Sequence, residues 1–150
     1  MADTANENER RMRQALGLAR ATVGLASPNP QVGCVLVRDG EVVGEGAHLY
    51  DGYDHAEILA LKQAEELGVD VHGATAYVTL EPCPMCAGAL IAARVGRLVF
   101  GAPDPKAGAC GSLYNLCADP RLNHELPVDH GVREAECAEL LQGWFVARRG

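Results

Sequence analysis

The chain has 150 residues, 48% of them hydrophobic, which is enough to build one globular domain over residues 1–150 with a substantial core. No apolar run approaches the length of a membrane span and no signal-peptide pattern opens the sequence, so we expect a cytoplasmic protein without a membrane partner. The formal net charge of −7 is untypical of proteins that wrap nucleic acid, although a small basic patch on an acidic body remains compatible with an RNA substrate.

The first predicted element is an amphipathic helix over residues 6–23, where apolar side chains recur at intervals of three and four. Pro28 and Pro30 interrupt the helical pattern on either side of Asn29. Taken alone, this segment is either a rigid loop or a loop that holds Asn29 at the mouth of a pocket.

A β-hairpin is predicted next. Residues 32–37 are almost continuously apolar, Asp39-Gly40 is a turn pair, and residues 41–46 alternate in polarity. His48 follows at the end of the second strand, where a single histidine is usually solvated or bonded to a neighbour.

The middle of the chain alternates between helices and short strands. A helix over residues 56–67 is closed by Gly68, a strand over 74–80 follows, a second helix begins near Cys86, and another strand covers 97–101. This order predicts parallel strands joined by crossover helices.

The last third contains a loop over residues 102–111, rich in glycine and proline, which includes Asp104. Loops after parallel strands are common ligand sites in open α/β sheets. We expect one helical turn at residues 113–117, an edge strand at 124–128 and an amphipathic helix over 132–146.

Two short motifs carry the chemistry. His55 and Glu57 lie two residues apart, and Cys83 and Cys86 lie three apart. One imidazole and two thiolates can hold Zn²⁺ and leave its fourth position open, as in catalytic rather than structural zinc sites. Both motifs are predicted to open helices, where the helix dipole favours thiolate over thiol.

The alternative is a structural zinc site, which needs a fourth protein ligand. No second Cys or His pair offers one, so His48, Cys34 and Cys110 are the individual candidates. We expect the cysteines outside the motif, namely Cys34, Cys110, Cys117 and Cys137, to be reduced residues of the core.

The pattern H-x-E followed by P-C-x-x-C resembles the signature of zinc deaminases that act on nucleobases. Over nearly its whole length the chain is similar to the cytidine deaminase-like superfamily. The stretch from Gly73 onward, with T-L-E-P-C-P-M-C-A-G-A-L and D-P-K-A-G-A-C-G-S-L, resembles bacterial tRNA adenosine deaminases. The stretch over residues 27–57, with S-P-N-P-Q-V-G-C-V and D-H-A-E, resembles the diaminopyrimidine deaminase domain of the riboflavin pathway.

The resemblance implies an α/β fold, a three-layer α/β/α sandwich whose five-stranded mixed sheet is flanked by helices. It implies one Zn²⁺ per subunit, held by His55, Cys83 and Cys86, with Glu57 as the catalytic proton carrier. It makes Asn29, His48 and Asp104 candidate substrate-binding residues, and it implies a homodimer.

Three functions stay open on the sequence. The first is deamination of wobble adenosine in the tRNA anticodon loop to inosine. The second is deamination of a small substrate, such as the riboflavin-pathway diaminopyrimidine ribosyl phosphate or a free base or nucleoside such as guanine or cytosine. The third is a non-catalytic, zinc-stabilised binding domain, in which Glu57 would be dispensable.

Overall fold

The computed structural model describes residues 2–21, 31–48, 54–122 and 124–140. Its strands are β1 (Gly33–Arg38), β2 (Glu41–Ala47), β3 (Thr75–Leu80), β4 (Arg97–Ala102) and β5 (Val128–His130). Its helices are α1 (Ala2–Arg20), α2 (Ala56–Glu66), α3 (Pro84–Ala92), the 3-10 helix η1 (Leu116–Ala118) and a helical segment over residues 134–140.

The five strands form one mixed sheet in the order β2-β1-β3-β4-β5. Strand β1 pairs antiparallel with both β2 and β3, whereas β3, β4 and β5 pair in parallel. The expected hairpin and the expected parallel pair joined by the cysteine helix are both confirmed. The carboxyl end of β3 therefore leads directly into the start of α3.

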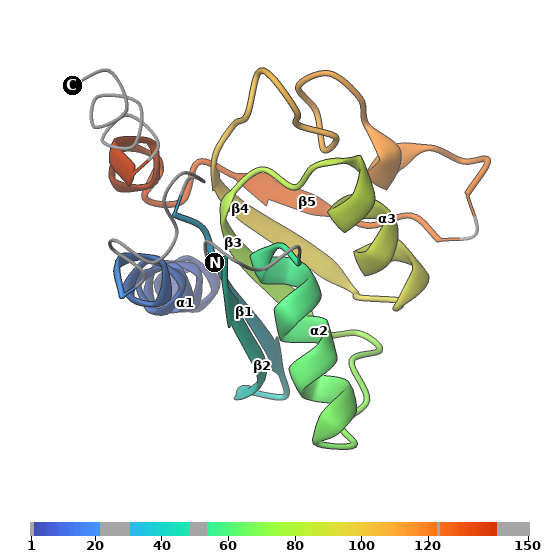
Figure 1. Cartoon of the computed structure of the whole chain (residues 1–150), viewed down its shortest axis with the longest axis horizontal. Coiled ribbons are helices and arrows are strands. Elements are labelled where there is room, and N and C mark those ends of the chain that lie inside the picture. Colours follow the sequence, from blue (N-terminus) through green and yellow to red (C-terminus); the bar gives the residue numbers. More distant parts are fainter. Residues whose placement is uncertain (1, 22–30, 49–53, 123, 141–150) are drawn as a thin grey trace.

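Helices cover both faces of the sheet (Figure 1), with α1 and the segment 134–140 on one side and α2 and α3 on the other. The two cores follow the alternation of side chains along each strand. Leu36, Val78 and Phe100 belong to the core under α2 and α3, and Tyr77 and Val99 to the core under α1. The predicted three-layer α/β/α sandwich is confirmed.

Two glycines of β2 let α2 lie directly against the sheet. A Cβ atom at Gly46 would lie 2.2 Å from the carbonyl oxygen of Ala56, and one at Gly44 would lie 2.4 Å from that of Ala60. Only glycine fits at such a close approach of two backbones. The start of α2, which carries His55 and Glu57, is thereby fixed against the hairpin.

The predicted edge strand at residues 124–128 was wrong, because β5 covers Val128–His130 instead. The N–H of Leu126 donates to the carbonyl of Cys117, which ties this segment to η1. Pro127 has no N–H to give to a ladder. Its carbonyl accepts a bond from Leu98, and regular pairing with β4 begins only at the next residue.

The boundaries of three helices also differ from the prediction. The first helix begins at Ala2 and ends at Arg20. The expected turn at 113–117 lies at Leu116–Ala118, because a bridge between Cys110 and Asn115 holds the preceding residues as a reverse turn. The last helix begins at residue 134, since Arg133 has a φ of 52° that no α-helix accommodates, and residues 141–146 of its predicted span lie outside the described residues.

The cysteine prediction is confirmed: all six cysteines are free, and the four outside the motif are buried. Within the residues that the structure describes, no helix is long and apolar enough to cross a membrane.

Candidate functional site

The predicted metal ligands lie at the starts of two neighbouring helices. His55 is the N-cap residue of α2, Cys83 is the N-cap residue of α3, and Cys86 lies in the first turn of α3. Neither N-cap side chain makes a capping hydrogen bond, and both belong to the cluster that could hold a metal ion. Pro84 at the first position of α3 suits a helix start, where its missing N–H costs nothing.

The three side chains converge on one point. One donor atom from each of His55, Cys83 and Cys86 lies within 4.8 Å of the others. His55 Nδ1 is 3.6 Å from Cys83 Sγ and 3.4 Å from Cys86 Sγ. Among the described residues no fourth His, Cys, Asp or Glu joins this group, so His48, Cys34 and Cys110 do not close it. The arrangement fits a metal ion that keeps an open position.

The protonation of the cluster also suits a metal. A hydrogen bond from the Cys86 thiol lowers the pKa of Cys83 to about 4. The same hydrogen bond raises the pKa of Cys86, because Cys86 is the donor and keeps its proton. The hydrogen bond with Cys83 raises the pKa of His55. The lowered pKa of Cys83 favours its thiolate, which is the form of a cysteine side chain that binds a metal ion.

Glu57 lies in the first turn of α2, and one of its two carboxyl oxygens lacks a hydrogen-bond partner. The residue is 3% exposed, and its Oε1 atom has no hydrogen-bond partner. Burial raises the pKa of its carboxyl to about 7. A buried carboxyl oxygen without a partner is unfavourable in a folded protein, so Oε1 is free to bond to a ligand.

A cavity of about 190 Å³ opens beside the cluster. Its walls include His55, Glu57, Cys83, His48 and Asp104. Glu57 and two of the metal ligands therefore face the same space as two of the predicted substrate-binding residues.

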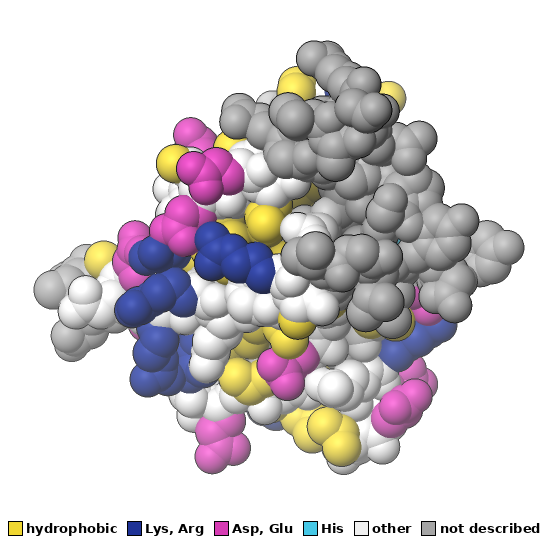
Figure 2. Space-filling model, turned by 60° about the vertical axis from the view of Figure 1, so that its left-hand side comes forward, with side chains coloured by type: hydrophobic (Ala, Val, Ile, Leu, Met, Phe, Trp, Pro, Cys, Tyr) yellow, Lys and Arg dark blue, Asp and Glu magenta, His cyan; other side chains and the backbone are white. Residues whose placement is uncertain are grey.

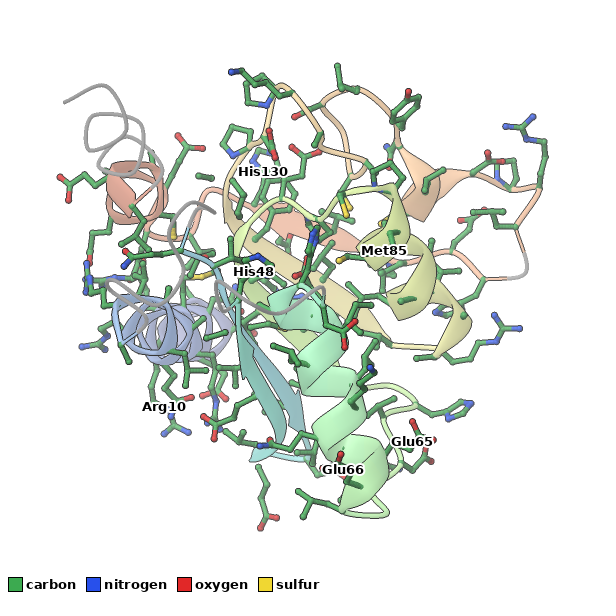
Figure 3. All side chains as sticks on the ribbon, in the orientation of Figure 1. Arg10, His48, Glu65, Glu66, Met85 and His130 are labelled. Atoms are coloured by element: carbon green, nitrogen blue, oxygen red, sulfur yellow. The ribbon has the colours of Figure 1, made fainter. Side chains whose placement is uncertain are left out.

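His48 is a buried wall of this cavity and not a solvated side chain. It is 8% exposed, and its Nδ1 lies 3.0 Å from the carbonyl oxygen of Asp54. Its ring meets that of His55 edge to face, with 5.3 Å between centroids. Figure 3 shows His48 beside the start of α2.

Of the other two predicted substrate-binding residues, Asp104 lies in a described part of the chain and Asn29 does not. Asp104 lines the cavity, but its Oδ1 accepts the N–H groups of Lys106 at 3.0 Å and Ala107 at 3.2 Å. That oxygen therefore shapes the loop. Asn29 lies outside the described residues.

Sequence reasoning missed Glu81, which also lines the cavity and is 3% exposed. Its carboxylate accepts hydrogen bonds from the backbone of Asp104, Cys110 and Ser112 and from the Ser112 hydroxyl. The signal in the sequence was a single acidic residue placed directly between an apolar strand and the Pro-Cys of the metal motif.

The arginines near the chain start are largely paired with acids. Figure 2 shows side chains of both charges close together on the face that carries α1. Arg11, only 3% exposed, bonds to Glu7 at 2.7 Å, and Arg20 pairs with Glu136 at 3.2 Å. Arg11 therefore belongs to the fold and is not available to a nucleic acid.

Comparison with known proteins agrees with this geometry. The family model for the cytidine and deoxycytidylate deaminase zinc-binding region matches residues 5–102. The chain is 46% identical over 120 residues to the tRNA-specific adenosine deaminase of Bacillus subtilis, covering 76% of this chain and 74% of that protein.

Two solved structures are similar over most of this chain. One, from a study of tRNA:A34 deaminases, has a TM-score of 0.77 and 40% identity, covering 87% of this chain and 98% of the other. The second is a diaminohydroxyphosphoribosylaminopyrimidine deaminase/reductase of Thermotoga maritima, with a TM-score of 0.82 and 34% identity. It covers 95% of this chain, which spans only 41% of that longer protein.

The family match includes His55, Glu57, Cys83 and Cys86 and covers well over half of the chain. His55, Cys83 and Cys86 form one cluster, and Glu57 lines a cavity together with His55 and Cys83, in a fold shared with solved deaminases. The chain belongs to the cytidine and deoxycytidylate deaminase family of zinc-binding hydrolytic deaminases.

Proposed function

We propose that this deaminase converts adenosine at the wobble position of a tRNA anticodon loop to inosine. Among its relatives, a tRNA-specific adenosine deaminase shares 46% identity over 120 residues, and a wobble-position deaminase structure is matched over 98% of its length. The deaminase chemistry itself rests on one observation: Glu57, whose buried Oε1 has no hydrogen-bond partner, lines the same cavity as the metal ligands His55 and Cys83.

In this proposal His55, Cys83 and Cys86 hold one Zn²⁺ per chain. Bound zinc supplies a water molecule whose pKa is lowered to about 7. Cys86 is fully buried, whereas His55 and Cys83 are partly buried and line the cavity, so a metal ion held by the three side chains would be next to the space proposed for the substrate.

Glu57 moves the protons. The overall reaction exchanges the amino group of the ring for oxygen and consumes one water for each ammonia released. Glu57 accepts a proton from the attacking water at Oε1 and delivers protons to the ring nitrogen and to the departing amino group. Its pKa of about 7 allows the carboxyl group both to accept and to release a proton near neutral pH.

His48, Asp104 and Asn29 are the proposed substrate-binding residues. The buried ring of His48 offers Nε2 to the cavity, because its Nδ1 is engaged by the Asp54 carbonyl. Asp104 lines the cavity from its loop, and Asn29 stays a prediction from the sequence. An adenine that turns out of its stack can be bound here by its edge.

The second candidate is a small diaminopyrimidine nucleotide. The buried His48 favours it, because the chain resembles the riboflavin-pathway deaminases in this stretch, and that fold neighbour has a TM-score of 0.82. The net charge of −7 is also less of an obstacle to a small substrate than to an RNA.

Ammonia release distinguishes the two candidates. The purified protein is incubated with an anticodon stem-loop that carries adenosine at the wobble position, with the same stem-loop carrying guanosine there, and with the diaminopyrimidine ribosyl phosphate. We expect ammonia and inosine from the adenosine stem-loop alone. Turnover of the pyrimidine without turnover of the RNA, at any salt concentration, would replace the first candidate with the second.

Further features belong to the same proposal. We propose a homodimer, supported by large apolar side chains that are exposed on the monomer, among them Met85 at 54%, Leu113 at 53% and Tyr114 at 58%. Sedimentation equilibrium measures the mass directly. The single domain over residues 1–150 and the cytoplasmic location stay predictions.

A further inference from the structure

We propose that Glu81 is a positioning residue for the deaminase site, whose buried carboxylate holds residues 104–112 in place as one wall of the substrate cavity. The inference rests on the proposed function, because it assigns that cavity to the substrate. Glu81 itself belongs neither to the metal cluster nor to the proton path.

Both oxygens of the Glu81 carboxylate are fully used within the loop. Oε1 accepts the N–H of Asp104 at 3.0 Å and the hydroxyl of Ser112. Oε2 accepts the N–H groups of Cys110 and Ser112, each at 3.0 Å. These bonds join the beginning of the loop to its end through one side chain. Hydrogen bonds to a carboxylate are stronger than those between neutral groups, so this loop is a fixed wall.

The loop is also shaped to receive the carboxylate. A Cβ atom at Gly108 would lie between 2.3 and 2.5 Å from three atoms of the Glu81 carboxyl group. The backbone at Gly108 thus lies directly against the carboxylate, and any larger residue would displace it. The same glycine donates its N–H to the carbonyl of Asp104 at 2.8 Å, which closes the turn around the buried charge.

The carboxylate connects this wall to the metal motif. Glu81 stands two residues before Cys83, and the carbonyl of the intervening Pro82 accepts the N–H of Ala109 at 2.9 Å. On the cavity side, Asp104 and Ala107 contribute to the lining. Removing the bonds to Glu81 would therefore loosen the wall that contacts the substrate and leave the ligand set and Glu57 in place.

The test is Glu81→Gln, which keeps the size of the side chain but turns an N–H₂ donor toward backbone N–H donors. Three experiments are made: zinc per chain is determined, KM and kcat are measured for ammonia release, and hydrogen exchange is followed at the amides of Asp104, Cys110 and Ser112. We expect stoichiometric zinc, a KM raised about 10-fold or more, a kcat that changes far less, and faster exchange at these three amides.

Glu66→Gln is the matched control, because it makes the same chemical change at the exposed far end of α2 and should alter none of these quantities (Figure 3). Ser112→Ala removes one donor only and should raise KM by a smaller factor. If Glu81→Gln fails to fold, the same measurements on Ser112→Ala test the proposal.

Loss of zinc, an unchanged KM in both variants, or equally accelerated exchange throughout β3 and β4 would overturn the assignment. If the wild-type protein released no ammonia from any substrate, the proposed function would fail separately. Exchange at the three amides would then still decide whether Glu81 holds the loop.

Discussion

Gly46 of β2 lies where α2 meets the hairpin, and we predict that replacing it with alanine displaces the start of α2. In Gly46→Ala the new Cβ would lie 2.2 Å from the carbonyl oxygen of Ala56, 2.8 Å from the nitrogen of Ala60 and 2.9 Å from the Cβ of Leu59. Ordinary contact begins at 3.4 Å, so the start of the helix must retreat by about 1.2 Å. Backbone atoms cannot rotate away as a flexible side chain can.

This retreat acts on stability and on the site together. Overpacking of this kind costs about 1–3 kcal/mol of unfolding free energy. His55 and Glu57 lie on either side of Ala56 and move with it. A displacement of about 1 Å in a catalytic group can lower activity about 100-fold. We therefore expect Gly46→Ala to be less stable, to bind zinc more weakly and to lose most of its ammonia release.

Urea unfolding, zinc analysis and the ammonia assay test this expectation on the same preparation. Gly17→Ala is the control, because a Cβ at Gly17 meets nothing within 4 Å. Gly17 lies in the last turn of α1, where this change should stabilise the protein by at most about 0.5–1 kcal/mol and leave activity unchanged. Wild-type stability and activity in Gly46→Ala would refute the argument that glycine is required for the close approach of α2.

Three further predictions concern the metal, the core and the surface. A strong chelator should abolish ammonia release, and Zn²⁺ should restore it where Mg²⁺ does not, because thiolate ligands select the softer ion; restoration by Mg²⁺ would contradict the ligand assignment. Leu98→Ala should lower the unfolding free energy by about 2–5 kcal/mol in urea titrations, since Leu98 is fully buried, and a loss under 1 kcal/mol would contradict its place in the core. Arg20→Ala should cost less than about 1 kcal/mol by the same titration, because its ion pair with Glu136 is exposed, and a larger loss would mean that the pair is better shielded than its geometry indicates.

The sequence was most informative where structure is set by neighbouring residues. Apolar periodicity located α2 and β3 to within a residue or two, and the spacing of His55, Cys83 and Cys86 predicted a shared cluster because each motif opens a helix. The hairpin followed from its turn pair, Asp39-Gly40.

The rest depends on contacts between distant parts of the chain. Strand β1 pairs with β3 in antiparallel register across about 40 residues of sequence, which no local pattern encodes. Leu126 is drawn to η1 and not into the sheet, which moved the edge strand. Glu81 looked like an ordinary acid beside the motif, and only the folded loop brings its four donors together.

The burial of two polar residues, Arg11 and His48, was also not predictable from the sequence. Arg11 stands beside Arg10 and near Arg13 in the sequence, but it is buried against Glu7 and the carbonyl of Gly40. His48 is a buried wall of the cavity, which its position at a strand end alone does not reveal. Burial is a property of the packed layers, so such residues are recognised only in three dimensions.

The central claim is that three side chains hold one zinc ion while Glu57 moves protons beside it. The most direct measurement is zinc content together with ammonia release in Glu57→Gln, compared with the wild-type protein. We expect stoichiometric zinc in both proteins and a turnover about 10²–10⁴-fold lower in the variant. Wild-type turnover in Glu57→Gln, or a wild-type protein that is active without zinc, would contradict the account.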